Sequence, residues 1–377
     1  MTDSRTDPEA ASNAASVTSA LQALLRGAIA RAGGWLPFDR YMALALYAPG
    51  LGYYAHGSRK FGHLPVSGSD FVTAPEMTPL FGQALAVAVG DALAATQTDE
   101  VWEFGAGTGA LASQLLQVLG GRVRRYTIVD LSGALRARQQ DALAAHGDKV
   151  QWASELPEIL RGVVVGNEVL DAMPVKLLTR LGGTWYERGV MWASGAQGEH
   201  LAWSDRVTDL RPPVDIPGTH EYLTEIHPQA QAFMRTLADR LSQGAAFFLD
   251  YGFPEDEYFH PQRHMGTLMC HRGHRADTDP LADVGLKDIT AHVDFTGVAL
   301  AAQEAGLPTL GYTSQGRFLL NCGLAQALAE APLDQRVAGQ RLIAEHEMGE
   351  LFKVIAFHKG PAWDAIGFTQ GDRTARL

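Results

Sequence analysis

Apolar residues follow helical spacing in the first part of the chain. Over residues 18–31 they recur three or four positions apart, which predicts a helix that Gly33 and Gly34 would end. An aromatic stretch, FDRYMALALYAPGLGYY, and a loop rich in Gly and Ser follow it. Proline is favoured in the first turn of a helix, so Pro75 predicts a second helix that runs to about residue 93.

From about Val101 the pattern changes to short apolar runs that alternate with helical segments. VWEF, YTIVD, VVVGN and AAFFLDYG predict strands, YTSQGRFLL and LFKVIAFHK predict two late strands, and residues 290–306 show a helical pattern. This alternation is typical of a doubly wound, mostly parallel sheet. We therefore expect a Rossmann-like α/β fold.

Two regions depart from the alternation of strand and helix. Residues 184–227 are strand-like and rich in Pro, and residues 253–288 are loop-like with many His, Arg and Asp. We interpret both as lid segments inserted at one edge of the sheet, where long loops usually serve function. The expected organisation is a disordered tail over 1–17, an N-terminal helical cap over 18–98 that contributes to the pocket, and the main domain over 99–377.

Composition and charge exclude several classes of protein. The 377 residues are 46% hydrophobic and 19% charged, an ordinary globular balance, and the formal charge of −11 disfavours a general nucleic-acid binder. Cys270 and Cys322 lack CxxC spacing, so we expect neither a disulfide framework nor a zinc site. We see no apolar run of membrane-spanning length, and the acidic N-terminal segment argues against a transit peptide. A cytoplasmic protein is expected.

The segment EFGAGTG places three glycines directly after a strand and before a helix. Gly105, Gly107 and Gly109 would let the backbone approach a ligand closely at a helix N-terminus. Asp130 ends the next strand, where a carboxylate can accept both hydroxyls of a ribose. This combination favours a nucleoside-containing cofactor over a plain strand–turn–helix.

Two cofactors fit this turn, and charge separates them. A dinucleotide motif is satisfied in its looser form by Gly107, Gly109 and Ala112. However, Glu103 lies two positions before the first glycine, and its charge would repel a diphosphate but attract the ammonium and sulfonium of S-adenosylmethionine. The residues therefore favour S-adenosylmethionine, with a dinucleotide as the alternative.

The stretch GNEVLDAMP follows the third apolar strand with an amide and two carboxylates. Asn167, Glu168 and Asp171 could not stay in a buried strand without partners. We place them at the rim of the pocket, where the strand ends beside the cofactor turn, and Pro174 ends the excursion. The alternative is a capped loop in which Asp171 only begins a helical turn.

These segments resemble the MidA-like family of class I methyltransferases, which includes the mitochondrial complex I assembly-factor protein arginine methyltransferase. The resemblance covers nearly all of the chain after the tail, through FDRYMALALYAPGLGYY, SDFVTAPEMTPLFG, EFGAGTGALA, GNEVLDAMPV, LDYGFP and GTLMCHRGHRADTDPLADVGLKDITAHVDF. It implies a methyltransferase domain over 99–377, S-adenosylmethionine as methyl donor and a protein arginine as acceptor. One departure is Ser69, which separates Gly68 from Asp70 where the family commonly has Gly-Asp-Phe.

The pattern and the resemblance together give a set of candidate site residues. A guanidinium acceptor is cationic and would be repelled by the sulfonium, whereas adjacent carboxylates can orient it and take its proton. The resemblance adds the loop of Asp70, Phe71 and Pro75 as a second wall of the pocket. The predicted catalytic residues are Glu168, Asp171 and His292, with Tyr251 and Asp294 as neighbours that could help.

The predicted cofactor-binding residues come from the glycine turn, the next two strand ends and the resembling loop. They are Thr73, Glu76, Glu103, Gly105, Ala106, Gly107, Thr108, Gly109, Asp130, Leu131, Asn167 and Glu168. His271 and His274 are three positions apart without a Cys partner, so no metal is expected there.

The function that these residues favour is methyl transfer to an arginine of a protein, with a complex I subunit as the partner that the resemblance implies. A small-molecule O- or N-methyltransferase is the first alternative, and a non-catalytic assembly factor that binds S-adenosylmethionine is the second. The acceptor, the product and the oligomeric state stay open, with a homodimer as one candidate. Neither nucleic-acid binding nor membrane insertion is expected.

Overall fold

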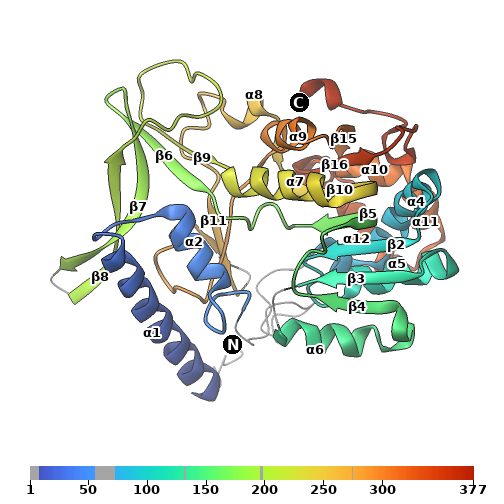
Figure 1. The fold of residues 1–377 in the computed structure, drawn as a ribbon, viewed down its shortest axis with the longest axis horizontal. Coiled ribbons are helices and arrows are strands. Elements are labelled where there is room, and N and C mark those ends of the chain that lie inside the picture. Colours follow the sequence, from blue (N-terminus) through green and yellow to red (C-terminus); the bar gives the residue numbers. More distant parts are fainter. Residues whose placement is uncertain (1–7, 56–72, 131–132, 196–197, 274) are drawn as a thin grey trace. The chain divides into compact units, whose positions relative to one another are not determined.

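The computed structural model describes residues 8–55, 73–130, 133–195, 198–273 and 275–377. The chain divides into two compact units, each assembled from three separate segments (Figure 1). Unit 1 comprises Met1–Ser58, Ala172–Ile226 and Phe259–Ala291, and unit 2 comprises Arg59–Asp171, His227–Tyr258 and His292–Leu377.

Unit 2 is built on an eight-stranded sheet with the order β15-β16-β10-β5-β2-β3-β4, and β14 pairs with β10 beside this path. Within this order, the neighbouring strands β10, β5, β2, β3 and β4 run parallel to one another. Strand β16 is antiparallel to both β10 and β15. This topology confirms the expected doubly wound, mostly parallel sheet and a Rossmann-like α/β fold. The strands are β2 (Glu100–Phe104), β3 (Arg125–Val129), β4 (Val150–Ala153), β5 (Leu160–Asn167), β10 (Leu241–Phe253), β14 (Val293–Asp294), β15 (Thr309–Ser314) and β16 (Phe352–Lys359).

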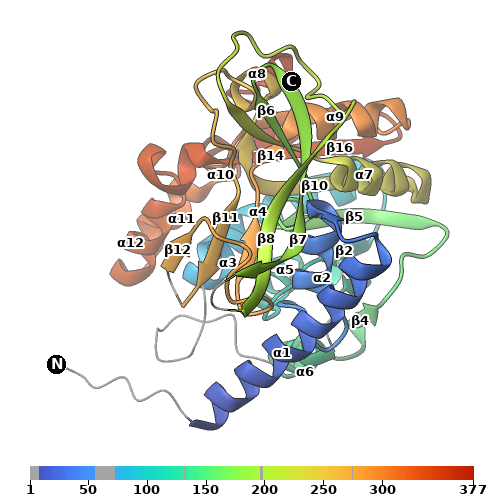
Figure 2. The ribbon, with the colours of Figure 1, turned by 90° about the vertical axis from the view of Figure 1, so that its left-hand side faces the viewer.

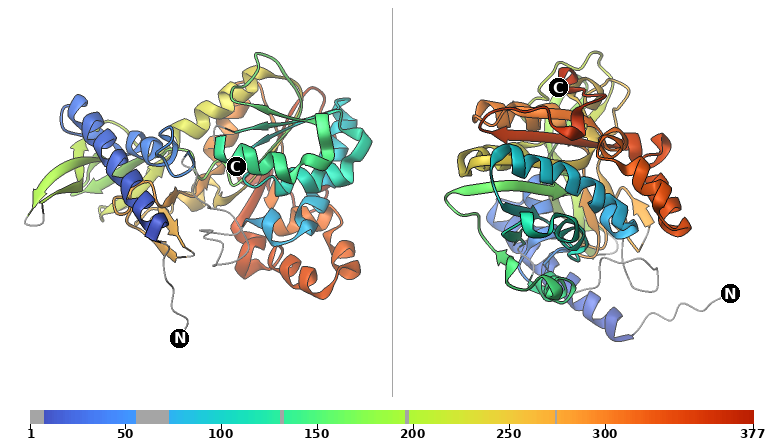
Figure 3. Two further views of the ribbon diagram at one scale, coloured as in Figure 1. Left: turned by 90° about the horizontal axis from the view of Figure 1, so that it is seen from below. Right: turned by 90° about the vertical axis from the view of Figure 1, so that its right-hand side faces the viewer.

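Helices cover both faces of this sheet (Figures 1 and 3). Alternate strand residues point to opposite faces, so Phe247 joins the cluster of α4 and α5, whereas Phe248 meets Phe233 of α7 with ring centroids 5.7 Å apart. Burial of both faces explains why the strands read as continuous apolar runs. The helices are α3 (Ala74–Met77), α4 (Pro79–Thr96), α5 (Ala110–Leu119), α6 (Gly133–Ala142), α7 (Pro228–Arg240), α8 (Glu255–Tyr258), α9 (Phe295–Glu304), α10 (Gln315–Asn321), α11 (Leu324–Glu330) and α12 (Leu333–Arg341).

Helix α4 is the core helix of unit 2. Its 18 residues, with a mean hydropathy of 1.3, are long and apolar enough to cross a membrane, which the search for apolar runs in the sequence did not detect. However, 67% of this segment is buried inside the structure, as in the core helix of a soluble protein, so its length and composition are weak evidence of a membrane span.

Unit 1 combines two helices with two antiparallel sheets. Helices α1 (Pro8–Arg31) and α2 (Phe38–Tyr47) pack on β7 of a five-stranded sheet with the order β1-β7-β6-β9, and β8 pairs with β7 (Figure 2). The second sheet has the order β12-β11-β13. The strands are β1 (Leu36–Pro37), β6 (Lys176–Leu181), β7 (Thr184–Gly195), β8 (Gly198–Val207), β9 (Tyr222–Ile226), β11 (Met269–Arg272), β12 (Arg275–Asp277) and β13 (Asp288–Thr290).

The structure divides the chain differently from the sequence-based expectation. Helix α1 begins at Pro8, inside the expected tail, and α3 and α4 belong to unit 2 and not to an N-terminal cap. Thr78, in an extended conformation, interrupts the helix expected from Pro75, and its side chain accepts a hydrogen bond from the N–H of Leu80 at the start of α4. The expected strand YTSQGRFLL ends at Ser314, after which QGRFLL forms α10.

The two regions interpreted as edge insertions form sheets of their own. The first contains β7, which pairs with β1, β6 and β8, and β9, which pairs with β6; the second contains β11, β12 and β13. No strand of either region pairs with the sheet of unit 2 among the residues that the structure describes. The hairpins β6–β7, β7–β8 and β11–β12 join neighbouring strands, whereas β1 pairs with β7 and β9 pairs with β6 across long stretches of the chain, and those pairings are not evident from local sequence patterns.

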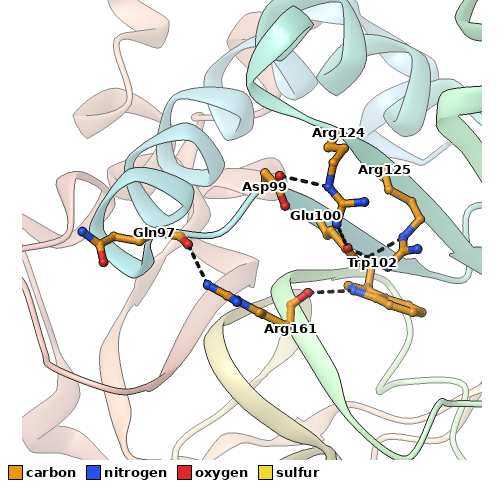
Figure 4. Close-up of polar contacts among 7 residues, drawn as sticks. All are labelled: Gln97, Asp99, Glu100, Trp102, Arg124, Arg125 and Arg161. Atoms are coloured by element: carbon orange, nitrogen blue, oxygen red, sulfur yellow. Dashed lines mark hydrogen bonds and ion pairs between the residues drawn. The ribbon is translucent and has the colours of Figure 1, made fainter.

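A polar cluster connects the amino-terminal ends of β2 and β3 (Figure 4). Glu100 is 8% exposed and accepts hydrogen bonds from Arg124 and from Arg125, whose Nε and Nη2 lie 3.1 Å and 2.6 Å from its Oε2. Arg124 also donates to the exposed Asp99 at 3.0 Å. Because burial of an ion pair is favourable only when its hydrogen bonds are made, Glu100 is the residue on which this cluster depends.

We therefore predict that Glu100→Gln lowers the unfolding free energy by about 1.5–3 kcal/mol, because two guanidinium groups lose a charged acceptor. Asp99→Asn removes a carboxylate from the same cluster at an exposed position, and it should change stability much less. Urea unfolding of the two variants in parallel measures the difference. Equal midpoints for the two variants would contradict the assignment of Glu100 as the central group.

Candidate functional site

The glycine turn joins β2 to α5 at the carboxyl end of the parallel strands. Gly105, Gly107 and Gly109 have φ values of +63°, +53° and +87°, the left-handed region that side chains other than glycine rarely adopt. A Cβ atom on Gly105 would lie 3.1 Å from the side chain of Val169, so the turn also approaches the segment that follows β5. The turn thus requires glycine for its backbone conformation.

Asp130 follows β3 and is held by a buried glutamine of α6. The Nε2 of Gln139 lies 2.9 Å from Oδ2 of Asp130 and 3.0 Å from the carbonyl oxygen of Gly107, so one amide connects the acid to the glycine turn. Trp152 of β4 donates its Nε1–H to Oε1 of Gln139 at 2.9 Å. Sequence patterns do not indicate Gln139 or Trp152, because neither residue belongs to a recognisable motif or to a regular spacing of apolar residues.

Glu103 is buried one residue before the end of β2. Its Oε2 accepts a hydrogen bond of 2.7 Å from the hydroxyl of Tyr126 on β3. Burial raises the pKa of Glu103 from 4.5 to about 7, the hydrogen bond from Tyr126 opposes this shift, and the charge of Asp130 adds to it. The carboxylate expected beside the glycine turn is therefore present, and it titrates near neutral pH.

Helix α3 brings a second acid to the glycine turn. The hydroxyl of Thr108 donates to Oε1 of Glu76 at 3.0 Å, and Glu76 is 7% exposed. Thr73 precedes α3, where its carbonyl oxygen accepts from the N–H groups of Glu76 and Met77. The two residues expected from the loop before α4 therefore support the turn on the side of α3.

The chain turns sharply where β5 ends. Glu168 has a φ of +54°, a strained conformation for a residue with a side chain, and its N–H donates to the carbonyl oxygen of Leu249 at 2.9 Å. The Nδ2 of Asn167 lies 3.1 Å from Oε1 of Glu168. The buried Oδ1 of Asn167 has no hydrogen-bond partner among the described residues, which leaves an acceptor for a ligand.

Asp250 fixes the backbone of this turn from the neighbouring strand β10. Its Oδ2 accepts from the N–H groups of Val169, Leu170 and Asp171 at 3.1, 2.9 and 3.3 Å. Burial, together with the charges of Asp171 and Glu168, raises its pKa well above the ordinary range. Asp250 was missed as a site residue, although an acid at the end of the apolar run AAFFL is the same signal that identified Asn167 and Glu168.

Two aromatic residues of β10 contact the other predicted catalytic residues. The hydroxyl of Tyr251 donates to Oδ2 of Asp171, and the rings of Tyr251 and Phe253 each lie 5.2 Å from the ring of His292. The carbonyl oxygen of His292 accepts a hydrogen bond of 2.9 Å from Nε2 of His227. Burial lowers the pKa of His227 to about 4, so this ring is neutral and donates.

Asp294 has a structural role that accounts for its position. It is the N-cap of α9, and its Oδ1 accepts from the N–H of Gly297 at 3.0 Å. Burial raises the pKa of Asp294 to about 7. Asp294 therefore caps a helix.

Unit 2 brings most of the predicted site residues to one edge of its sheet. Parallel strands end at the same edge, so the segments that follow β2, β3, β5 and β10 meet there. Three predicted residues, Leu131 of the cofactor set and Asp70 and Phe71 of the expected pocket wall, lie outside the described residues. The ligand contacts of the other residues stay predictions.

Fold and site together define a class I methyltransferase that uses S-adenosylmethionine. Residues 84–313 match a family of S-adenosyl-L-methionine-dependent methyltransferases, and the chain belongs to this family. The resemblance to the MidA-like methyltransferases is thereby confirmed, and so are the enzyme class and the cofactor.

Solved structures give the same result over the full length. A protein of Burkholderia thailandensis crystallised with S-adenosyl-homocysteine is 49% identical, with a TM-score of 0.92 and 99% of both chains covered. A native structure from the same organism is 48% identical with a TM-score of 0.88, again over 99% of both chains.

Curated relatives share about a quarter of their residues with the chain. The Drosophila melanogaster protein named "Protein arginine methyltransferase NDUFAF7 homolog, mitochondrial" is 27% identical, over 94% of this chain and 88% of its own. The Mus musculus protein of that name, without "homolog", is also 27% identical, over 86% and 81% of the two chains. The expectation of a cytoplasmic location is wrong, because the relatives are named as mitochondrial, and the acidic N-terminal segment was given too much weight against a transit peptide.

The residues of unit 2 fit S-adenosylmethionine in shape and charge. The left-handed glycines leave room for close approach of a ligand, and Oδ1 of Asn167 is an available buried acceptor. Glu103 and Asp130 end adjacent strands and bring negative charge to an edge that would receive a cationic cofactor. These are the residues that would hold it.

The raised pKa of Glu103 predicts a specific dependence of stability on pH. Its pKa is about 7 in the folded chain against an ordinary 4.5, so the protonated form favours folding. This stabilisation is present below pH 4.5 and is lost as the pH rises to about 7, a loss of about 3 kcal/mol at 1.36 kcal/mol per pKa unit. We expect Glu103→Gln to make the fall in stability with pH shallower by this amount, while Asp294, whose pKa is also raised to about 7, still contributes to it.

Urea unfolding of the cofactor-free protein between about pH 5 and 8 measures the effect. Glu304→Gln, at an exposed position of α9, should keep the wild-type profile and serves as the control. A Glu103→Gln variant whose stability falls with pH as steeply as the wild type would show that another group causes the dependence.

Proposed function

We propose that this methyltransferase transfers the methyl group of S-adenosylmethionine to an arginine side chain of a protein. The observation that supports this most directly is the group of acids at the ends of β5 and β10. Glu168 and Asp171 follow β5, Asp250 lies near the carboxyl end of β10, and hydrogen bonds connect Asp250 to the backbone of the turn that contains the other two.

A cationic acceptor would explain why these acids lie together, because it could pair with them. Burial, and after it the charges of Asp171 and Glu168, raise the pKa of Asp250, so the acids repel each other in the absence of a cation. A guanidinium presents several N–H donors in a planar fork that matches carboxylate geometry. Glu168 would orient one nitrogen of the acceptor and receive its proton, and Asp171 would add negative charge beside it.

When bound, S-adenosylmethionine supplies a methyl group on a sulfonium for an in-line displacement. Much of the rate of such a reaction comes from holding the acceptor in the correct geometry. The strained turn at Glu168 and the fixed backbone after it suit that task, because they leave the side chain little freedom.

The names of the relatives agree with a protein arginine as acceptor. The proteins from Drosophila melanogaster and Mus musculus are both named as protein arginine methyltransferases at 27% identity. A subunit of respiratory complex I is the candidate partner, on the resemblance that the sequence shows.

Two alternative functions would require different properties of the same residues. A small-molecule O- or N-methyltransferase would not need a cationic acceptor, so its activity would not depend on the charge of Glu168. A non-catalytic assembly factor would bind S-adenosylmethionine without transferring its methyl group. The acids at the ends of β5 and β10 favour an enzyme with a cationic acceptor over both.

Labelled methyl transfer tests the acceptor directly. The protein is incubated with tritiated S-adenosylmethionine and a lysate of source cells that lack it, and the labelled band is analysed by mass spectrometry. Methylarginine in a protein supports the proposal. Label confined to small molecules would favour the first alternative, and bound cofactor without any transfer would favour the second.

Asp130 is expected to bind the ribose of the cofactor. Asp130→Ala should weaken S-adenosylmethionine binding by about 1–3 kcal/mol, because the cofactor loses a charged hydrogen-bond acceptor. Isothermal titration calorimetry measures the change, and Asp141→Ala at an exposed position of α6 provides the control for loss of charge. Equal affinities for Asp130→Ala and the wild type would remove Asp130 from the site.

Glu168, which is also among the expected cofactor-binding residues, is predicted to act chiefly on the acceptor. Glu168→Gln keeps the size of the side chain and removes its charge, so cofactor affinity should stay within about threefold while transfer to arginine falls by about 100-fold or more. Calorimetry and labelled transfer are measured on one preparation, with Glu158→Gln as an exposed control. Full activity would exclude this role, and a matching loss of cofactor affinity would assign Glu168 to the cofactor.

A further inference from the structure

The turn after β5 folds around an internal anion. Three consecutive N–H groups, those of Val169, Leu170 and Asp171, converge on one oxygen of Asp250 at 2.9–3.3 Å. The other oxygen accepts from the N–H of Tyr251 at 3.0 Å, and Asp250 is only 1% exposed. A run of N–H groups next to a left-handed residue is a recurrent way in which backbone binds an anion.

This arrangement determines the conformation of Glu168. The N–H of Glu168 makes a bond to Leu249 at the end of the parallel pairing, and the next three N–H groups then turn towards Asp250. A φ of +54° at Glu168 is the conformation at which this change of direction occurs. Such a strained residue persists only where the surrounding contacts determine it, and the bonds to Asp250 supply those contacts.

Tyr251 holds the side chain at the other end of the same turn. Its hydroxyl donates to Asp171, and its ring is fixed by His292 and Phe352, whose centroids lie 5.2 Å and 5.3 Å away. Two consecutive residues of β10 therefore hold the backbone of the turn and its terminal carboxylate.

We propose that Asp250 and Tyr251 are positioning residues, which hold the turn after β5 so that Glu168 is presented to the acceptor. Their role in catalysis rests on the proposed function. Their role in holding the turn is independent of which acceptor the enzyme methylates. Asp250 acts through the backbone of residues 169–171, and Tyr251 acts through Asp171.

The effect on the turn can be measured without any acceptor. Asparagine can offer only one acceptor oxygen, and its amide donors oppose the N–H groups that face it, so Asp250→Asn should release the turn. Hydrogen exchange of the amides of Val169, Leu170 and Asp171 in cofactor-free protein should become at least about tenfold faster, with the rest of β5 unchanged. Unchanged exchange at these three amides would overturn the proposal whatever the enzyme methylates.

The kinetic effect separates positioning from general loss of stability. Asp250→Asn should lower kcat for an arginine acceptor by about 10- to 100-fold, with cofactor affinity within about threefold of the wild type. Asp91→Asn is a matched control, because Asp91 also holds backbone in unit 2, through bonds to Trp363 and to the N–H of Ile366 at 2.9 and 3.2 Å. It should lower stability without changing kcat.

A double-mutant cycle with Glu168→Gln shows whether Asp250 acts through Glu168. If it does, Asp250→Asn should cost less than about threefold in kcat when Glu168 is already glutamine. An undiminished loss in that background would assign Asp250 a role independent of Glu168. If Asp250→Asn does not fold, Tyr251→Phe takes its place in the same cycle, because it removes only the hydroxyl that bonds to Asp171.

A failure of the proposed function would look different from a failure of this inference. Without transfer to arginine by the wild type, the kinetic cycle is run on the acceptor that mass spectrometry identifies, and hydrogen exchange still decides whether the turn is held. With transfer to arginine but additive losses in the cycle, the function stands and the positioning role is wrong.

Discussion

Three backbone N–H groups converge on the buried carboxylate of Asp250, and this contact determines how the chain leaves the central sheet after β5. Buried backbone groups must be paired, and the segment after β5 has left the ladder that would otherwise pair them. A single side chain of β10 replaces three ladder bonds. The turn can therefore be tight, left-handed at Glu168 and still fully hydrogen-bonded to the core of unit 2.

The same edge of the sheet concentrates negative charge, and each acid is retained by a specific partner. Tyr126 donates to Glu103, Gln139 donates to Asp130, and the backbone of the turn donates to Asp250. Neutral donors of this kind satisfy an oxygen without cancelling its charge. A cationic ligand, such as a sulfonium or a guanidinium, would favour the ionised form of these acids, two of which burial otherwise shifts towards the neutral form.

The fold could be predicted from the sequence because its signals are local. Each strand of the parallel sheet is buried on both faces and therefore reads as an apolar run. Each helix between two strands shows apolar residues at helical spacing. QGRFLL was assigned wrongly because six residues are too few to separate a helical period from a strand. The five-stranded sheet of unit 1 was predicted only in part, as strand-like residues 184–227, because β1 pairs with β7 and β6 pairs with β9 across long stretches of the chain.

The candidate site was predictable only where a residue follows a strand or a glycine turn. Glu103, Asp130 and Glu168 have such positions, whereas Gln139 and Asp250 contribute through hydrogen bonds to segments that lie far from them in the sequence. Asp294 shows the opposite case. It was grouped with His292 by proximity, although its place directly before the helical run at Phe295 indicated an N-cap.

The backbone of the glycine turn does not by itself select the cofactor. A turn with three left-handed glycines can receive a diphosphate or S-adenosylmethionine, since both need close approach to the backbone. The difference comes from the acids at the strand ends. A diphosphate would bring further negative charge to a region where burial and a neighbouring acid already raise the pKa of Glu103, and the repulsion would be strongest where water is excluded. A cationic cofactor reverses the sign of this interaction and stabilises the ionised form of each acid near it. Charge at the strand ends, and not the shape of the turn, therefore commits this fold to S-adenosylmethionine.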